Sequence, residues 1–222
     1  MADQAARRYG NRSQQILRAA VHLFSSRGFD ATSIRDIASA AGVQPASVYY
    51  HFPSKDALLI AVVDEAAHML AEHVSAAPAS DDPWQRLQSA CEAHLEVLLH
   101  GEGNVRVLAT EIPTRRGGDL HRALVRTRDA YEEIFRRLVD DLPVADDVDR
   151  RYLRLTLLGA INWTLIWYQP GGDGPATIAD RIVSLLRHGA DSPVPAAPSP
   201  ESGTVALAPV GGDVPGREEL AR

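Results

Sequence analysis

The stretch TSIRDIASAAGVQPASVYYHFPSK, residues 32–55, decides the fold of this chain. Its first half predicts a short helix, because Ser33 can cap a helix and Asp36 can complete a capping box. Gly42 follows the apolar stripe of that helix and can end it in a left-handed conformation. Pro45 suits the first turn of a second short helix. Two short helices joined by a glycine turn are the layout of a DNA-reading helix-turn-helix.

The second of these helices carries side chains that suit the major groove of DNA. Val48 and Phe52 lie four residues apart, so both are expected to face the core. The opposite face then presents Gln44, Ser47 and Tyr50, whose polar groups can reach base edges. The expected DNA contacts are Thr32, Ser33, Gln44, Pro45, Ala46, Ser47, Tyr49, Tyr50, His51 and Lys55. The aromatic residues of this helix can also be read as ordinary core aromatics of a small helical bundle.

Lys55 is the only lysine of the chain and follows Ser54, which can cap a third helix. In the first turn of that helix it would lie beside the positive end of the helix dipole and the free backbone N–H groups, which favour a phosphate. The sequence therefore predicts that Lys55 contacts the DNA backbone.

This stretch resembles the TetR family of bacterial transcriptional repressors. The resemblance is carried by residues 32–38 (TSIRDIA), 41–43 (AGV), 48–52 (VYYHF) and 54–55 (SK), with Ile16, Ala20, Leu23, Phe24 and Phe29 in family-like places before them. It implies an all-α fold of about nine helices. A three-helix DNA-binding domain with the helix-turn-helix would span residues 1–56, and a helical ligand-binding and dimerisation domain would span residues 57–190.

The charge distribution agrees with a DNA-binding first domain. The chain has a formal net charge of −6, yet residues 1–56 carry seven basic and four acidic residues. The remaining residues carry sixteen basic and twenty-five acidic residues. A basic domain attached to an acidic one attracts DNA phosphates through one end of the molecule only.

Length and composition restrict the class of protein further. The 222 residues can form one or two domains with a real core. Neither a signal peptide nor a run of eighteen apolar residues occurs, so we expect a cytoplasmic protein without a membrane partner. The single cysteine, Cys91, excludes an internal disulfide and fits a reducing compartment. It can be read as a small buried hydrophobe or as a redox sensor.

The remaining sequence reads as helical throughout. Apolar periodicity and breaks at glycine and proline place helices at about 55–76, 84–101, 104–111, 120–142, 146–168 and 175–189. Pro113 is expected to end the third of these. The tail at 191–222, rich in Pro, Ala, Gly and Ser, is expected to be disordered.

The helix at 152–168 is apolar nearly all round, which indicates burial on several sides. The family resemblance makes the last two helices a dimer bundle, in which Gly159 and Ala160 would permit close helix approach. Trp163 and Trp167 share one face and can serve a ligand pocket, a core or a dimer contact. The expected ligand-binding residues are Trp163, Trp167, Cys91 and Leu95.

The effector is expected to be a hydrophobic small molecule. The segment LLGAINWTLIWYQPGG, residues 157–172, resembles actinobacterial members of the family that respond to acyl-CoA or steroid-CoA thioesters. Arginines 106, 115, 116 and 122 could meet a phosphate or carboxylate at a pocket mouth. A multidrug-type sensor repressor with a lipophilic drug as effector is the alternative.

Other functions have weaker support in the sequence. Asp64, His68 and Glu72 share a helix face at metal-ligand spacing, but a solvated polar face is the simpler interpretation. Zinc-protease, phosphate-loop, nucleophile-elbow and redox motifs do not occur. We therefore expect no cofactor, no metal and no enzymatic activity. A small all-helical enzyme or interaction protein stays as the alternative class, to be distinguished by salt-dependent DNA binding.

Overall fold

The computed structural model describes residues 2–101, 103–114 and 118–189, and these residues form nine α-helices and no strand. In chain order they are α1 (Ala2–Arg27), α2 (Ile34–Ala40), α3 (Pro45–His51), α4 (Lys55–Ser75), α5 (Pro83–His100), α6 (Gly103–Thr114), α7 (Gly118–Asp140), α8 (Arg150–Trp167) and α9 (Pro175–His188). The all-α fold expected from sequence is confirmed. The expected tail at 191–222 lies outside the described residues.

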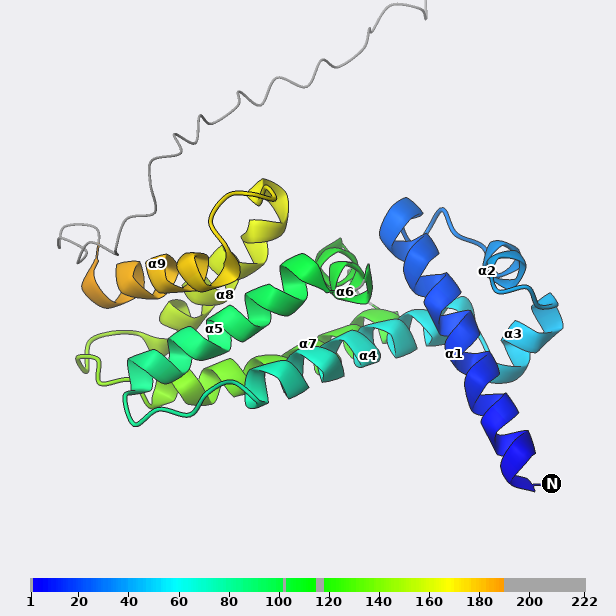
Figure 1. Ribbon diagram of the computed structural model, residues 1–222, viewed down its shortest axis with the longest axis horizontal. Helices are drawn as coiled ribbons and strands as arrows, with labels where there is room; N and C mark the ends of the chain where they lie inside the picture. The colour runs from blue at the N-terminus through cyan, green and yellow to red at the C-terminus, as the bar shows by residue number, and fades with distance from the viewer. Residues whose placement is uncertain (1, 102, 115–117, 190–222) are drawn as a thin grey trace, which may run out of the picture.

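The first three helices form a compact head at one end of the molecule (Figure 1). The Ser33 hydroxyl accepts from the backbone N–H of Asp36, and the Asp36 carboxylate accepts from the backbone N–H of Ser33, so the capping box is complete. Gly42 has a φ of 62°, a left-handed conformation that few side chains adopt at low cost. Pro45 begins α3, where its missing N–H costs no hydrogen bond.

One apolar cluster holds the head together and extends into the rest of the chain. It is built from buried residues of the first four helices and their connections, together with one residue each from α6 and α7: Ile16, Ala20, Leu23, Phe24, Phe29, Ile34, Ile37, Ala38, Ala41, Val48, Leu58, Leu59, Val62, Val63, Val107 and Leu124. Because Val107 and Leu124 join this cluster, the head packs directly on body helices. The first half of α4 also packs with the head, beyond the domain boundary proposed at residues 56–57.

The second half of α4 and α5 to α9 form the body. α4, α5 and α7 run alongside one another away from the head, and α9 lies against α5 with α8 beside it (Figure 1). A second apolar cluster fills the space between these helices, with Leu70, Leu87, Leu95, Phe135 and Ile161 among its buried members. No helix within the described residues is long and apolar enough to cross a membrane.

The largest differences between the observed helix boundaries and the sequence expectation are at α6 and α8. α6 continues through Pro113 to Thr114, so proline does not end the helix two residues earlier as expected. α8 begins at Arg150 and not at Asp146, because the Asp149 carboxylate accepts from the backbone N–H of Arg151 and caps the helix there. The capping aspartate, three residues after Asp146, thus determines the start of α8.

Candidate nucleic-acid interface

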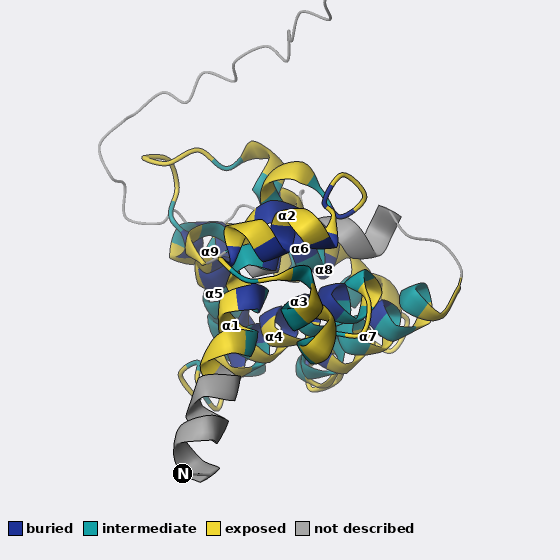
Figure 2. Ribbon diagram, turned by 90° about the vertical axis from the view of Figure 1, so that its right-hand side faces the viewer, coloured by how far each residue is buried: buried dark blue, intermediate teal, exposed yellow. Residues whose placement is uncertain are grey.

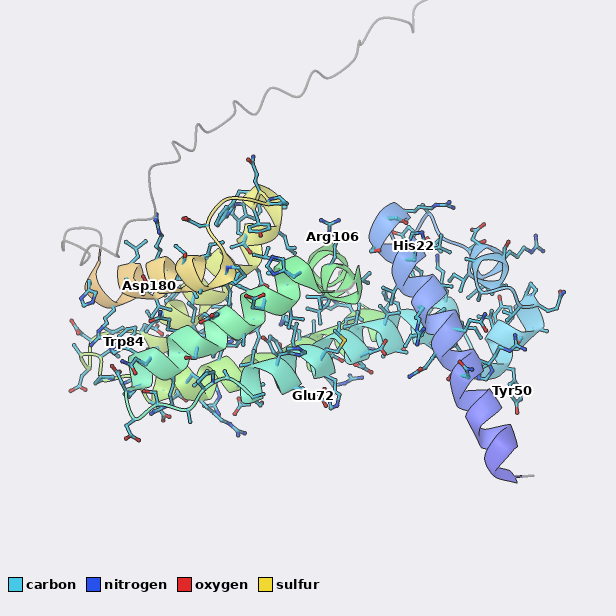
Figure 3. The ribbon with its side chains drawn as sticks, in the orientation of Figure 1. His22, Tyr50, Glu72, Trp84, Arg106 and Asp180 are labelled. Atoms are coloured by element: carbon cyan, nitrogen blue, oxygen red, sulfur yellow. The ribbon has the colours of Figure 1, made fainter. Side chains whose placement is uncertain are left out.

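The outer face of α3 presents the side chains that the sequence assigned to DNA. Val48 is fully buried beneath this helix, and Phe52 is half-buried. Tyr50 is 74% exposed and Tyr49 is 53% exposed, so neither is a core aromatic. In Figure 2 the head faces the viewer, and exposed surface covers much of α2 and α3. Tyr50 extends outward from the end of the head (Figure 3).

The other assigned positions on α3 surround these tyrosines. Gln44 and Ala46 are exposed, while Pro45, Ser47 and His51 are half-buried. The Gln44 side chain makes no capping hydrogen bond to α3. Gln44, Ser47 and Ala46 therefore offer an amide, a hydroxyl and a methyl group along one helix, and the major groove of DNA admits a helix.

Two of the assigned residues have structural roles at the base of α2. The Ser33 hydroxyl is used in the capping box, which also lowers the pKa of Asp36. Thr32 is 2% exposed, and its hydroxyl donates to the backbone carbonyl of Gly28 at 2.8 Å. The Thr32 side chain therefore supports the head from within, a role that the sequence did not indicate.

Lys55 also has a structural role that the sequence did not reveal. Its Nζ donates to the backbone carbonyls of Phe29 and Thr32, each at 2.9 Å, and lies 4.2 Å from the centre of the Phe29 ring. Two of its three N–H donors therefore join α4 to the loop before α2. The expected phosphate contact would have to use the third donor.

The residues assigned to a ligand pocket do not come together. Cys91 and Leu95 are fully buried in the body core, and burial raises the pKa of the Cys91 thiol, which argues against redox sensing. Trp163 and Trp167 lie on the opposite, outward side of α8, 63% and 48% exposed. The two pairs lie apart because α8 turns its buried side, including Leu157 and Ile161, toward α5, so the ligand role of all four residues stays a prediction.

The outward side of α8 is instead an apolar surface, which we call the α8 face. Its exposed members are Tyr152, Leu155, Gly159, Trp163, Ile166 and Trp167, and Leu185 of α9 is exposed as well. A Cβ atom at Gly159 would meet nothing within 4 Å, so the chain itself does not require glycine there. Large exposed apolar surfaces of this kind mark interaction sites.

Family models match both parts of this structure. Residues 16–62, the head and the start of α4, match the family of bacterial regulatory proteins called tetR. Residues 80–190, half of the chain, match the tetracycline repressor-like C-terminal domain. The chain belongs to the TetR family. Members are DNA-binding transcription factors and not enzymes, so the chain is a transcription regulator whose DNA-binding part is the head.

Relatives of this TetR-family protein cover most of its length. It is 28% identical over 184 residues to the HTH-type transcriptional repressor KstR2 of Mycolicibacterium smegmatis, covering 78% of this chain and 86% of the relative. It is 29% identical over 205 residues to KstR2 of Rhodococcus jostii, covering 86% and 97%. Among solved structures, AibR in complex with isovaleryl coenzyme A and operator DNA has a TM-score of 0.68 at 23% identity, covering 79% and 97%.

The three residues at metal-ligand spacing, Asp64, His68 and Glu72, have other contacts. The imidazole of His68 pairs with Glu72 at 3.2 Å on the exposed side of α4, and the Asp64 carboxylate accepts from the Thr127 hydroxyl of α7. Within the described part of the chain, no group of three or more His, Cys, Asp or Glu residues could hold a metal ion. His68 and Glu72 thus form part of a solvated face of α4, and Asp64 forms a contact between α4 and α7.

A buried polar group in the body was not assigned from sequence. His94 is 2% exposed, and it bonds to Tyr131 of α7 and Asn162 of α8. Burial lowers the pKa of His94 to about 4. The sequence pattern does predict that His94 is buried, because it lies three residues after Cys91 and seven after Leu87, on the buried stripe of α5.

The buried histidine gives a pH-dependent stability. The pKa of His94 is about 4 in the folded protein and about 6.5 when unfolded, so the unfolded chain binds more protons between these values. The free energy of unfolding should fall by up to about 3 kcal/mol as the pH drops from above 6.5 to 4. Urea titrations of the unchanged protein and of His94→Phe test this. Equal pH dependence in both proteins would contradict it.

Proposed function

We propose that this TetR-family protein is a ligand-responsive transcriptional repressor that binds a palindromic operator as a homodimer and is released by a hydrophobic small molecule. The observation that carries the proposal is the exposed outer face of α3, where Gln44, Tyr49 and Tyr50 stand clear of the head core. The name of the KstR2 relatives, HTH-type transcriptional repressor, supports repression as the mode of action.

In this proposal, Gln44, Ala46, Ser47 and Tyr50 read base edges, with Tyr49 and His51 on phosphates. A glutamine amide can pair with adenine, and a methyl group can contact thymine. Because the Ser33 backbone N–H and hydroxyl are used in the capping box, a phosphate contact at the start of α2 would use the backbone N–H groups of the first turn that follow Ser33.

Removing a base-reading side chain should weaken operator binding and relax sequence preference. For Tyr50→Ala and Gln44→Ala, we expect a loss of about 1–3 kcal/mol each, or about 5- to 150-fold in affinity. Fluorescence anisotropy with the operator and with point-changed operators measures both effects. His68→Ala, on the exposed side of α4, is the matched control and should bind like the unchanged protein. Loss of affinity without any change in sequence preference would assign these side chains to phosphates instead.

The proposed homodimer forms through the α8 face and α9. Its apolar side chains lose water when a second copy covers them, which favours association. Gly159, at the centre of the face, lets a helix approach closely without removing a side-chain contact of its own chain. A two-fold dimer would present two α3 helices about 34 Å apart, one turn of DNA.

The proposed effector is an acyl-CoA or steroid-CoA thioester, with a lipophilic drug as the alternative. Two clefts open where the head meets the body. One, of about 760 Å³, lies between α1, α4 and α5, with Leu17, Met69 and Val97 in its lining. The other, of about 390 Å³, joins apolar side chains of α5 and α8 to Arg106 of α6. A cleft that places apolar side chains such as Leu98 and Leu165 beside an arginine suits an acyl chain that carries an anionic group.

The structure of AibR with isovaleryl coenzyme A adds support for this effector class, since AibR has the same fold. A ligand wedged between head and body would shift the head through α1 and α4. It acts as an inducer only if it binds the shifted form better than the DNA-bound form. Coupling of about 1–3 kcal/mol gives about 5- to 150-fold weaker operator binding.

Titration into the protein–operator complex tests the effector. Acyl-CoAs, steroid-CoAs, free coenzyme A and lipophilic drugs are added while DNA anisotropy and tryptophan fluorescence are followed together. We expect a thioester to release DNA, free coenzyme A to have little effect, and Arg106→Gln to raise the concentration needed. Release by drugs alone would favour the multidrug-type sensor, and fluorescence change without release would contradict an inducer role.

A further inference from the structure

A chain of hydrogen bonds leads from the body core to the α8 face. The ring Nδ1 of His94 lies 2.6 Å from the Tyr131 hydroxyl, and its Nε2 lies 3.2 Å from Oδ1 of Asn162. His94 and Tyr131 are buried, whereas Asn162 is exposed beside Trp163. The chain thus begins among buried groups of α5 and α7 and ends at the edge of the apolar surface of α8.

The chemistry of the three groups fixes the direction of each hydrogen bond. An amide oxygen only accepts, so the Nε2–H of His94 donates to Asn162. Because its pKa is about 4, His94 is neutral and carries one ring proton, which leaves Nδ1 as an acceptor for the Tyr131 hydroxyl. The ring is held further by stacking with Tyr131 and by an edge contact with Phe135. Asn162 therefore turns its oxygen inward and its amide N–H groups away from His94.

The N–H groups of the Asn162 amide point toward the apolar α8 face, where they need a hydrogen-bond acceptor if that face becomes covered. Within the residues that the structure describes, His94 is the hydrogen-bond partner of the Asn162 side chain. When a second copy covers the α8 face, N–H groups left without an acceptor would oppose association. With an acceptor they fix one relative position of the two copies, as a buried asparagine does in a coiled coil.

We propose that Asn162 determines the specificity of homodimer pairing by donating from its amide to an oxygen of the second copy, with Tyr131 and His94 as positioning residues that keep the amide turned outward. This inference rests on the homodimer of the proposed function. Two-fold symmetry makes the contact occur twice in each dimer, so a change at one position in the sequence removes two hydrogen bonds.

Replacing Asn162 with alanine tests the proposal through the direction in which the dimer dissociation constant changes. If the amide donates across the dimer, Asn162→Ala leaves acceptors unpaired and should raise the dimer dissociation constant about 10-fold or more. If the amide has no acceptor in the second copy, its removal should leave that constant unchanged or lower it. Analytical ultracentrifugation of the full chain measures the constant, and circular dichroism checks that the variant is folded.

Tyr131→Phe tests the positioning role without touching the surface. It removes the donor to Nδ1, so the ring proton of His94 can move to Nδ1 and the Asn162 amide can turn over. We expect weaker dimerisation together with changed ¹⁵N shifts of the His94 imidazole. The matched control is Tyr168→Phe, which removes a tyrosine hydroxyl bonded to His100 at 3.2 Å, and it should leave the dissociation constant unchanged.

The outcomes separate this inference from the proposed function. A dimer that is weakened by Asn162→Ala and Tyr131→Phe but not by Tyr168→Phe supports it. A stable dimer whose dissociation constant is unchanged in the first two variants overturns the role of Asn162 and leaves the homodimer in place. An unchanged protein that stays monomeric up to about 100 µM overturns both.

Discussion

Replacing Trp163 with aspartate should produce a folded monomer that binds the palindromic operator at least about 100-fold more weakly than the unchanged protein. Trp163 is 63% exposed in the single chain, so its replacement leaves no cavity in the body core. In the proposed dimer, the carboxylate would be buried against a second copy without a partner, which costs about 3–5 kcal/mol. Two-fold symmetry places two such charges in each interface.

Light scattering measures the oligomeric state of the Trp163→Asp protein, and fluorescence anisotropy measures its affinity for the operator. Trp163→Phe is the matched control, since it keeps an apolar ring on the α8 face, and it should remain a dimer. A Trp163→Asp protein that stays dimeric and binds the operator normally would show that the two copies pair through another surface.

Replacing Lys55 with methionine should destabilise the head and not merely weaken a DNA contact. The variant keeps an unbranched chain but loses two hydrogen bonds from a charged donor and the contact with the Phe29 ring. Such bonds contribute about 1.5–3 kcal/mol each and a cation–π contact about 0.5–2 kcal/mol, and half-exposure of the lysine reduces both. We expect the free energy of unfolding to fall by about 2–4 kcal/mol.

Thermal or urea unfolding of Lys55→Met, followed by DNA titration at several salt concentrations, separates the two roles of this residue. A structural role lowers stability and weakens binding. If stability is unchanged and the dependence of log affinity on log salt drops by about one unit, Lys55 acts instead as the phosphate contact inferred from sequence.

The local structure of the head was predictable because it depends on neighbours in the sequence. The Ser33–Asp36 capping box, the left-handed Gly42 and the start of α3 at Pro45 each follow from residues within a few positions of one another. Thr32 and Lys55 were harder to interpret. Their partners, the carbonyls of Gly28, Phe29 and Thr32, are backbone atoms that leave no trace in the residue pattern.

The body was less predictable because a helix that is apolar all round does not reveal what covers each side. The sequence indicated that the helix carrying Trp163 and Trp167 is buried on several sides, but it could not distinguish a ligand pocket, the core and a second copy. Only the tertiary arrangement shows Leu157 and Ile161 inside and both tryptophans outside. The burial of His94 could be inferred from its place on the apolar stripe of α5, but its partners Tyr131 and Asn162 could not, because they are far away in sequence.

Selection of DNA from a random duplex library by the full chain tests whether the protein binds a palindromic operator as a homodimer. We expect enrichment of one inverted-repeat sequence whose half-sites are about one helical turn apart, bound by two chains and with affinity that falls steeply with salt. Tyr50→Ala should fail to enrich the same sequence. A library that shows no enriched sequence, or one bound by a single chain at an asymmetric site, would contradict a palindrome-binding homodimeric repressor.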